Sequence, residues 1–579
     1  MIVFTMLKRI LPAAVMTMVM TLATPALALL PPGPTPEPLA MENPLANPLV
    51  RRAQDALKKT GRYKGPVDGR MNRQLDRAIK TYQRAAGFAA DGQVTDKLIE
   101  RLETGGKVEA LLKRLDETRR RERAAAVKAL LSTPETSALI KGSRRRQDVA
   151  DPTRNPEQCF RRPTARCLLA ESLESAKAIN RPKMRDWALG ELLVAQAKAG
   201  MTGEAMDTVS RIHDPRLIMV ALRNIAEAQA ASGIGADAIA AAEIIPGPLK
   251  QAEAFAAITS IQTRRKDFAD ARKTARRLIG ILSEVKDPLQ RLAFHAGAAV
   301  AFGKAGDEKA ANRQMAIALN LSDNLIDASR KNAGLRRVAS ALAELDRPQR
   351  AMALLEKSGT GIERTPLLAT TAMAQARAGD GARAIDTAYA IKAVRYRSVV
   401  LTRIAEARIE TGDRAGARKT VDLALAAAGE IELPFARSFA MSRVARTLAR
   451  LGGDGFEAAV KAAAKIKDDR LRAHTLWIIT TGRRRGGDRE GAAATAVLAE
   501  TATSEIKSTL NRMWMFSELA LERASSPEPG AAWTDFKRAL KIAGTIQNAW
   551  ARTRALGQLA TVLVELGKSG LTPSRQPDR

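Results

Sequence analysis

A recurring turn constrains the fold of this chain more than any other feature. From about residue 158 to residue 567, a turn residue, usually glycine, is followed five positions later by alanine. The nine pairs are Gly200 and Ala205, Gly233 and Ala238, Lys266 and Ala271, Gly306 and Ala311, Asp346 and Ala351, Gly379 and Ala384, Gly412 and Ala417, Gly453 and Ala458, and Gly487 and Ala492. Successive turns lie 33, 33, 40, 40, 33, 33, 41 and 34 residues apart. A period of this length predicts a solenoid of stacked helical hairpins.

Each repeat carries the signals of two helices. Apolar residues at helical spacing precede the turn, the turn residue ends the first helix, and aspartate often follows it. These aspartates are Asp307, Asp380, Asp413, Asp454 and Asp488. The small alanine then lets the second helix pack closely on the first. Aromatic residues make up only 4% of the chain and helix-forming types dominate, so we predict an all-α protein.

The register of turn and alanine resembles the tetratricopeptide repeat over most of residues 185–567. The large aromatic positions of that family's first helix are mostly Leu, Ile or Ala here, and some units extend to about 40 residues. The resemblance implies a helical repeat array at residues 158–570 that binds a protein partner. We expect the last residues, 571–579, to form a disordered tail.

A compact block at residues 49–104 has a different pattern. An amphipathic helix with Val50 and Leu57 leads to a turn at Asp68-Gly69, and a second helix with Ile79 leads to a turn at Asp91-Gly92. A third helix is predicted from Val94 to Leu102. Asp-Gly pairs favour tight turns because glycine accepts a positive φ.

This order of helices and turns closely resembles the peptidoglycan-binding domain of bacterial wall hydrolases. The resemblance implies three helices and a shallow groove for the peptide stems of the wall, which bear carboxylates. The candidate binding residues are Arg62, Tyr63, Lys64, Asp68, Arg70, Arg73, Tyr82 and Gln83. The basic side chains could pair with carboxylates and the tyrosines could offer flat contacts. The alternative is that the tyrosines belong to the core and the basic residues only solubilise the domain.

The block departs from the family pattern at two helix starts. The family usually has glycine followed three residues later by threonine, whereas here Asn72 precedes Leu75 and Thr95 precedes Leu98. Because Asn and Thr are good N-cap residues, we expect both helices to start in place.

The N-terminus has the parts of a secretory signal peptide. Lys8 and Arg9 precede an apolar stretch that ends at Ala26-Leu27-Ala28. We predict cleavage of residues 1–28, a mature chain that starts at Leu29, and a periplasmic location without a membrane span. A retained anchor is the alternative. Residues 29–48 are rich in proline and are predicted to form an extended spacer.

The net charge of +32 is spread along the chain. Residues 49–104 carry 13 basic and 7 acidic side chains (+6), residues 105–157 carry 13 and 8 (+5), and residues 158–579 carry 66 and 45 (+21). Residues 105–157 are predicted to be a basic linker that begins as a charged helix and then becomes irregular. A dispersed charge favours attraction to an anionic surface over a dedicated nucleic-acid arm.

The only two cysteines, Cys159 and Cys167, are predicted to form a disulfide. On one continuous helix they would lie too far apart, but Pro163 breaks the helix between them. A catalytic thiol is the alternative, and it would need a nearby histidine, of which His213 is the nearest in sequence.

The sequence offers little for catalysis. The three histidines, His213, His295 and His474, are isolated and form no recognisable metal or nucleophile motif. We therefore expect no enzyme activity, metal or cofactor. The predicted function is a non-catalytic periplasmic protein that binds peptidoglycan and whose repeats scaffold a protein partner. A wall hydrolase or lyase with paired carboxylates is one alternative. A nucleic-acid-binding repeat protein is another, but it leaves the signal peptide and the wall-binding motif unexplained.

Overall fold

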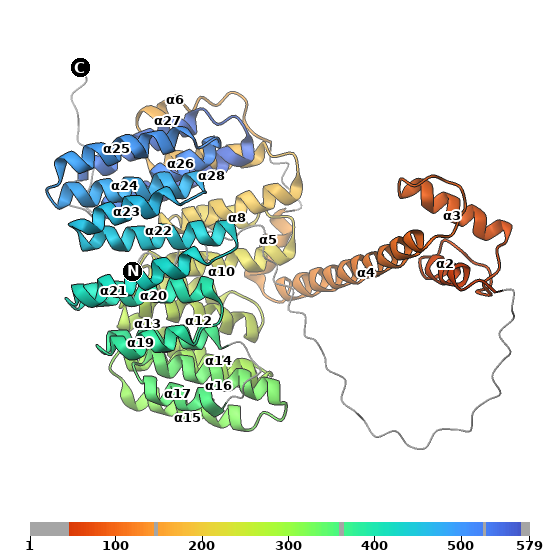
Figure 1. Cartoon of the computed structure of the whole chain (residues 1–579), viewed down its shortest axis with the longest axis horizontal. Helices are drawn as coiled ribbons and strands as arrows, with labels where there is room; N and C mark the ends of the chain where they lie inside the picture. Colours follow the sequence, from red (N-terminus) through yellow and green to blue (C-terminus); the bar gives the residue numbers. More distant parts are fainter. Residues whose placement is uncertain (1–45, 144–148, 358–363, 525–528, 569–579) are drawn as a thin grey trace. The chain divides into compact units, whose positions relative to one another are not determined.

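The computed structural model describes residues 46–143, 149–357, 364–524 and 529–568, and within these ranges it contains helices and no strand (Figure 1). This confirms the all-α prediction. The chain divides into two compact units, residues 1–125 and 126–579. The predicted signal peptide, nearly all of the proline-rich spacer and the predicted tail lie outside the described residues. None of the helices described is both long enough and apolar enough to cross a membrane.

The first unit is built from α2 (Pro48–Lys59), α3 (Arg73–Ala85) and the start of α4 (Asp96–Leu130). Leu57, Leu75 and Ile79 are fully buried in its core. The third helix is much longer than the predicted segment Val94–Leu102, because helix-forming Glu, Lys, Arg, Leu and Ala continue past it without a proline until Pro134. The boundary between the two units falls within α4.

The predicted basic linker, residues 105–157, is therefore largely helical. After α4 it contains α5 (Pro134–Ser143), and α6 (Glu157–Arg161) begins at its last residue. Leu130, Leu139 and Ile140 are buried within the core of the second unit. These three residues thus belong to the packing of the repeat array.

The helices of the array fall into two sets that alternate along the chain. The first set is α8 (Pro182–Lys198), α10 (Pro215–Ala231), α12 (Pro248–Arg265), α14 (Pro288–Lys304), α16 (Ala328–Glu344), α18 (Thr365–Arg377), α20 (Val394–Glu410), α22 (Pro434–Leu451), α24 (Asp469–Arg485), α26 (Thr509–Ala524) and α28 (Ala549–Lys568). The second set is α9 (Thr202–Val209), α11 (Gly235–Glu243), α13 (Phe268–Ile281), α15 (Glu308–Asp323), α17 (Pro348–Lys357), α19 (Gly381–Tyr389), α21 (Arg414–Gly429), α23 (Asp454–Ala464), α25 (Arg489–Ser504) and α27 (Pro529–Gly544). Each helix of the first set from α8 to α26 forms an antiparallel hairpin with the helix of the second set that follows it.

The array closes into a ring. Each helix of the first set packs on its neighbours in the same set, and the last of them, α28, packs on the first, α8. The second set has no comparable packing between its members, so it occupies the wider, outer circumference. The missing outer partner of α28 is α7 (Ala165–Lys177), which precedes α8 in sequence. Among the described residues, ten hairpins and the α7–α28 pair therefore form a closed circle, and Figure 1 shows the C-terminal helices beside α6 and α8.

Polar contacts join the two ends of the array at this seam. The Ser172 hydroxyl on α7 donates a hydrogen bond of 2.9 Å to the carbonyl of Thr553 on α28. Arg554 on α28 forms an ion pair of 2.6 Å with Glu191 on α8. Residues almost 400 positions apart in sequence are thus held together by packing and by specific polar contacts.

The predicted disulfide between Cys159 and Cys167 is confirmed, with the two Cα atoms 5.8 Å apart. It joins α6 to α7 across the break at Pro163. The ring of Phe160 on α6 lies 5.9 Å from the guanidinium of Arg552 on α28. The disulfide therefore ties α6 to the seam of the ring.

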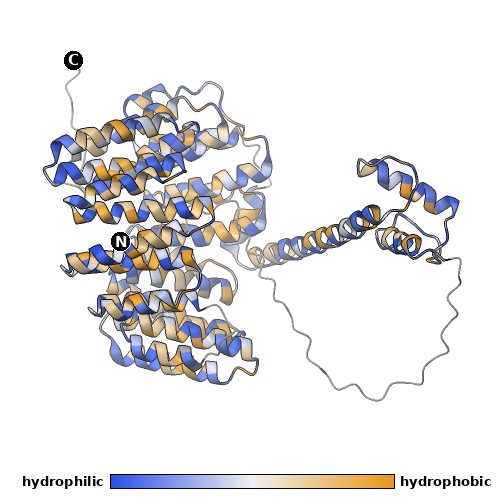
Figure 2. Ribbon diagram, viewed as in Figure 1, coloured by the Kyte–Doolittle hydropathy of each residue, from blue (hydrophilic) through white to orange (hydrophobic). Residues whose placement is uncertain are grey.

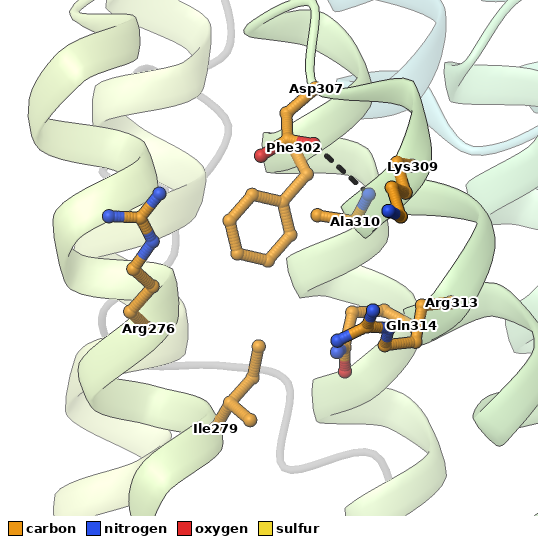
Figure 3. Close-up of a pocket in the computed structure, with 8 residues that line it drawn as sticks. All are labelled: Arg276, Ile279, Phe302, Asp307, Lys309, Ala310, Arg313 and Gln314. Atoms are coloured by element: carbon orange, nitrogen blue, oxygen red, sulfur yellow. Dashed lines mark hydrogen bonds between the residues drawn. The ribbon is translucent and has the colours of Figure 1, made fainter.

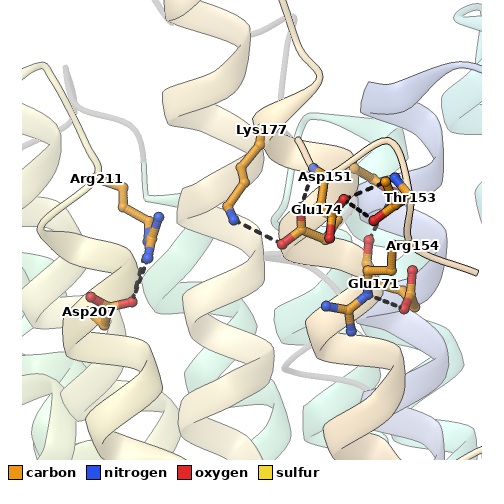
Figure 4. A network of polar contacts seen from close by, with 9 residues as sticks. Asp151, Thr153, Arg154, Glu171, Glu174, Lys177, Asp207 and Arg211 are labelled. Atoms are coloured by element: carbon orange, nitrogen blue, oxygen red, sulfur yellow. Dashed lines mark hydrogen bonds and ion pairs between the residues drawn. The ribbon is translucent and has the colours of Figure 1, made fainter. Parts of the chain in front are cut away.

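A polar network attaches the chain ahead of α6 to α7 (Figure 4). The backbone N–H of Asp151 donates to Glu174 over 3.1 Å, and Arg154 donates to Glu171 over 2.6 Å. Lys177 also pairs with Glu174, at 2.8 Å. This network fixes the entry of the chain into the ring.

The predicted turns are confirmed with one correction. Eight of the nine alanines named above are at most 2% exposed, but at the eighth turn the buried residue is Ala459, not Ala458. Two glycines, Gly452 and Gly453, both take positive φ there, so the turn is one residue longer and Asp454 becomes the first residue of α23. Figure 2 shows hydrophobic and hydrophilic residues alternating along the array helices, as helices with one apolar face require.

Candidate functional site

A buried glutamine holds the first Asp-Gly turn of the first unit. The side-chain amide of Gln54 donates hydrogen bonds of 2.9 Å to the carboxylate of Asp68 and to the carbonyl of Arg70. Its oxygen accepts a hydrogen bond of 2.8 Å from the backbone N–H of Gly69. The backbone N–H of Arg70 also donates to Asp68. These hydrogen bonds from Arg70 and Gln54 hold the pKa of Asp68 below its usual value.

The second Asp-Gly turn is built in the same way around Gln83. Its amide donates to the carboxylate of Asp91 over 2.7 Å and to the carbonyl of Gln93 over 3.3 Å. Its oxygen accepts from the backbone N–H of Gly92 at 2.9 Å. Gln83 is only 4% exposed, so this candidate binding residue shapes the turn from inside the domain. Gln54, its counterpart, was not among the predicted site residues. The signal for it was a glutamine on the apolar face of a helix that precedes an Asp-Gly turn.

Both candidate tyrosines are core residues. Tyr63 is 2% exposed, and its hydroxyl donates to the carbonyl of Pro66 and accepts from the side chain of Asn72. Tyr82 is 9% exposed, and its hydroxyl donates to the carbonyl of Arg101. The structure thus fits the core alternative for these two residues. Neither ring presents an open face for a ligand.

The four basic candidates and Asp68 are exposed on the first unit. Arg62 lies over the ring of Tyr82 at 5.5 Å and pairs with Glu109 at 3.5 Å. Within the described residues, Lys64, Arg70 and Arg73 form no ion pair with a carboxylate of the chain. Cations that lack an internal partner are available to anionic groups of a ligand. The structure therefore places the predicted basic cluster on the surface around the Asp68-Gly69 turn.

The two altered helix starts are capped as predicted. The side-chain oxygen of Asn72 accepts the backbone N–H of Leu75 at 2.8 Å. The hydroxyl of Thr95 accepts the backbone N–H of Leu98 at 3.3 Å. The substitutions away from the family pattern leave the helices in register, because Asn and Thr satisfy the same backbone donors.

The histidines lie apart in the array. His213 precedes α10 and lies 3.4 Å from Asp186, His295 on α14 contacts Gln314 at 2.7 Å, and His474 is buried on α24. Among the described residues, no group of three or more His, Cys, Asp or Glu side chains is arranged to hold a metal ion. The structure thus brings none of the histidines together with another.

The array also contains a basic pocket that the sequence did not indicate (Figure 3). It has a volume of about 380 Å³ and lies between α13 and α15. Arg276 and Arg313 face it from opposite helices, and Phe302 forms its floor. Asp307 lies at its edge and caps α15 by accepting the backbone N–H of Ala310 at 3.1 Å.

Comparison with known proteins identifies the first unit. Residues 46–102 match the family described as "Putative peptidoglycan binding domain". No curated protein matches the chain significantly.

Solved structures of helical proteins match the chain only distantly. Ton1535 from Thermococcus onnurineus NA1 is 18% identical and matches over 56% of this chain and 97% of its own, with a TM-score of 0.25. Rap protein complexed with competence and sporulation factor is 12% identical over 67% of this chain and 98% of its own, also with a TM-score of 0.25. A circular tandem repeat protein is 13% identical over 90% of this chain and 98% of its own, with a TM-score of 0.16. These scores carry no argument about function.

The assignment of the first unit rests on its sequence and on its geometry together. The matched segment covers the three helix starts and both glutamine-held turns. Residues 46–102 of this chain accordingly match the peptidoglycan-binding domain family, and they are joined to a closed array of helical hairpins.

Proposed function

We propose that this protein is a non-catalytic component of the bacterial periplasm that binds peptidoglycan through its first unit and holds a protein partner on its ring. The observation that carries the proposal is the family match at residues 46–102 together with the exposed cations around the Asp68-Gly69 turn. Carboxylates of the wall's peptide stems are the complementary groups. The predicted signal peptide supports the location.

The role of the ring as a scaffold is supported by apolar side chains on its surface. Tyr389, Leu433 and Phe435 are 48%, 55% and 53% exposed. Large apolar groups that remain in water are typical of surfaces that a partner covers. Capture experiments from envelope fractions should recover one protein with the wild-type chain and much less of it with the variant Phe435→Asp. Equal recovery would place the partner elsewhere.

Sedimentation with purified peptidoglycan tests the binding role. The full-length chain should pellet with the wall, and the triple variant Arg62→Ala, Lys64→Ala and Arg70→Ala should pellet less at both low and high salt. Surface attraction is screened beyond about 8 Å at physiological ionic strength, whereas direct contacts in a groove persist.

A matched control separates direct contacts from general charge. The variant Arg77→Ala, Arg84→Ala and Lys97→Ala also removes three exposed cations of the first unit. It should lose binding at low salt only. If the two triple variants behave alike, the cluster at the first turn has no specific role. If the wild-type chain pellets at no salt concentration, the binding proposal fails.

A further inference from the structure

The inner face of the ring can be recognised from one ion pair. Arg446 on α22 contacts Glu522 on α26 at 2.7 Å, although α24 lies between these two helices. Side chains of next-nearest helices can meet only on the concave side, where neighbouring helices converge. Trp514 and Glu518 precede Glu522 by eight and four residues on α26, so they share this inner face.

At the seam, two tryptophans lie close to Arg554 on the same face. Its guanidinium lies 4.6 Å from the ring centre of Trp550 and 5.7 Å from that of Trp514. It also pairs with Glu191 on α8. Trp187 lies one helical turn before Glu191 and is 54% exposed. We call Trp187, Trp514, Trp550, Glu191 and Arg554, with the ion pair of Arg470 and Glu518, the tryptophan belt.

The belt is electrically balanced within a strongly basic protein. Arg554 pairs with Glu191, and Arg470 pairs with Glu518 at 3.0 Å. The neighbouring Arg446 is likewise paired with Glu522. Each of these three arginines is thus paired with a carboxylate, so the belt offers no unpaired cation to a nucleic acid or an acidic peptide.

What the belt offers instead is a set of indole faces beside fixed hydrogen-bonding groups. The C–H faces of sugar rings stack on tryptophan, and their hydroxyl and acetamide groups bond to guanidinium and carboxylate groups. The chemistry of the belt thus fits a neutral ligand made of hydroxyl-rich rings. Trp187 supplies the most open of its faces.

The ring is wide enough for such a ligand. Eleven helices at a spacing of about 9 Å give a circle of about 30 Å between opposite axes. Subtracting one helix diameter of about 10–12 Å leaves an opening of about 20 Å. A single sugar chain is narrow enough to enter such an opening.

We propose that the tryptophan belt is a glycan-binding site that takes a neutral chain of N-acetylated sugars, such as the glycan strand of the wall. This site lies on the second unit and is additional to the binding role proposed for residues 46–102. The wall would then be held at two chemically different places, by its peptide stems and by its glycan.

Tryptophan fluorescence provides a direct test, because all five tryptophans of the chain lie in the ring and none lies in residues 46–102. The full-length protein is titrated with hexameric N-acetylglucosamine, a neutral probe. We expect a saturable change in emission and a matching isotherm by calorimetry. Trp187→Ala should weaken binding at least tenfold, and Trp187→Phe should restore part of it because a flat face remains.

Leu498→Ala is the matched control, since it removes a similarly exposed apolar side chain from the outer helix α25. Its affinity should equal that of the wild type. The triple variant of Arg62, Lys64 and Arg70 should also keep the fluorescence change, which separates this proposal from that for the first unit. An absent saturable signal, an unchanged affinity in Trp187→Ala with an intact circular dichroism spectrum, or a preference for polyglutamate would overturn the proposal.

Discussion

At the scale of single residues, the array buries polar side chains that its helices bring together. His474 is 4% exposed between α22 and α26, and its Nε2 lies 3.7 Å from Glu522. Burial lowers the pKa of His474 to about 3, with Arg446, Arg470 and Arg523 adding to the effect and Glu518 opposing it. The imidazole is therefore neutral in the folded protein, and burial raises the pKa of Glu522 beside it.

This histidine should make stability depend on pH. Its folded pKa lies below the usual value of 6.5, so its contribution is complete above pH 6.5 and is lost as the pH falls. The measurement is denaturant unfolding between pH 7.5 and 5.5. As the pH falls, the free energy of unfolding of the wild type should decrease by up to about 1.4 kcal/mol per pH unit more than that of His474→Gln, whose side chain does not titrate. Glu522 acts in the opposite direction but is present in both proteins. Equal slopes would show that the pKa of His474 is the same in the folded and unfolded chains.

At the scale of elements, two of the repeat turns have a residue other than glycine. Most turn residues are glycines with positive φ, but Lys266 and Asp346 adopt φ of 67° and 59°. A side chain in the left-handed region costs about 1–2 kcal/mol, less for aspartate. Asp346 also pairs with Lys304 and Arg377 on the adjacent helices α14 and α18, whereas Lys266 is exposed and forms no ion pair among the described residues.

Substitution by glycine should therefore affect stability differently at these two turns. Lys266→Gly should raise the free energy of unfolding by about 0.5–1 kcal/mol, since the relief of backbone strain exceeds the entropy that glycine adds to the unfolded chain. Asp346→Gly should raise the free energy of unfolding by less, or should lower it, because two ion pairs worth about 0.2–1 kcal/mol each disappear. Thermal midpoints of both variants measure the difference. Equal gains would mean that the ion pairs of Asp346 contribute nothing.

At the scale of the whole molecule, closure replaces the capping units that open arrays need. The terminal repeats of a solenoid usually carry a polar outer face because nothing covers them. Here α28 is covered on one side by α26 and on the other by α7 and α8, so both ends of the described array have a neighbouring helix. The seam joins the two ends of the same unit.

Deletion of residues 549–579 should open the ring. It removes α28 and leaves the inner faces of α7, α8 and α26 without their partner. We expect a larger radius of gyration in small-angle scattering and a lower thermal midpoint than for the wild type. Deletion of residues 569–579 alone, which keeps α28, serves as the control and should change neither quantity. An unchanged radius in the longer deletion would show that the curvature of the array does not depend on closure.

Local patterns determined much of this protein. The turn and alanine register predicted the hairpins, Pro163 predicted the fold-back that allows the Cys159–Cys167 disulfide, and the Asp-Gly pairs predicted the turns of the first unit. Each of these depends on the conformational preferences of a few neighbouring residues, so it can be recognised without knowledge of distant contacts. The extra residue at Gly452-Gly453 displaced one alanine because periodicity alone does not reveal a longer turn.

Only the tertiary structure decided how these pieces meet. Closure requires a rotation of about 33° at each of eleven helix pairs, and so small a rotation arises from packing across whole interfaces. It brings Glu191 on α8 to Arg554 on α28, which no local pattern links. The same holds in the first unit. Tyr63 and Tyr82, which were candidate ligand contacts, are buried in its core. Gln54 holds a turn that lies fourteen residues further along the chain. Contacts between distant segments depend on the packing angles of all the helices between them. These angles add up along the chain, so no single stretch of sequence predicts the contact.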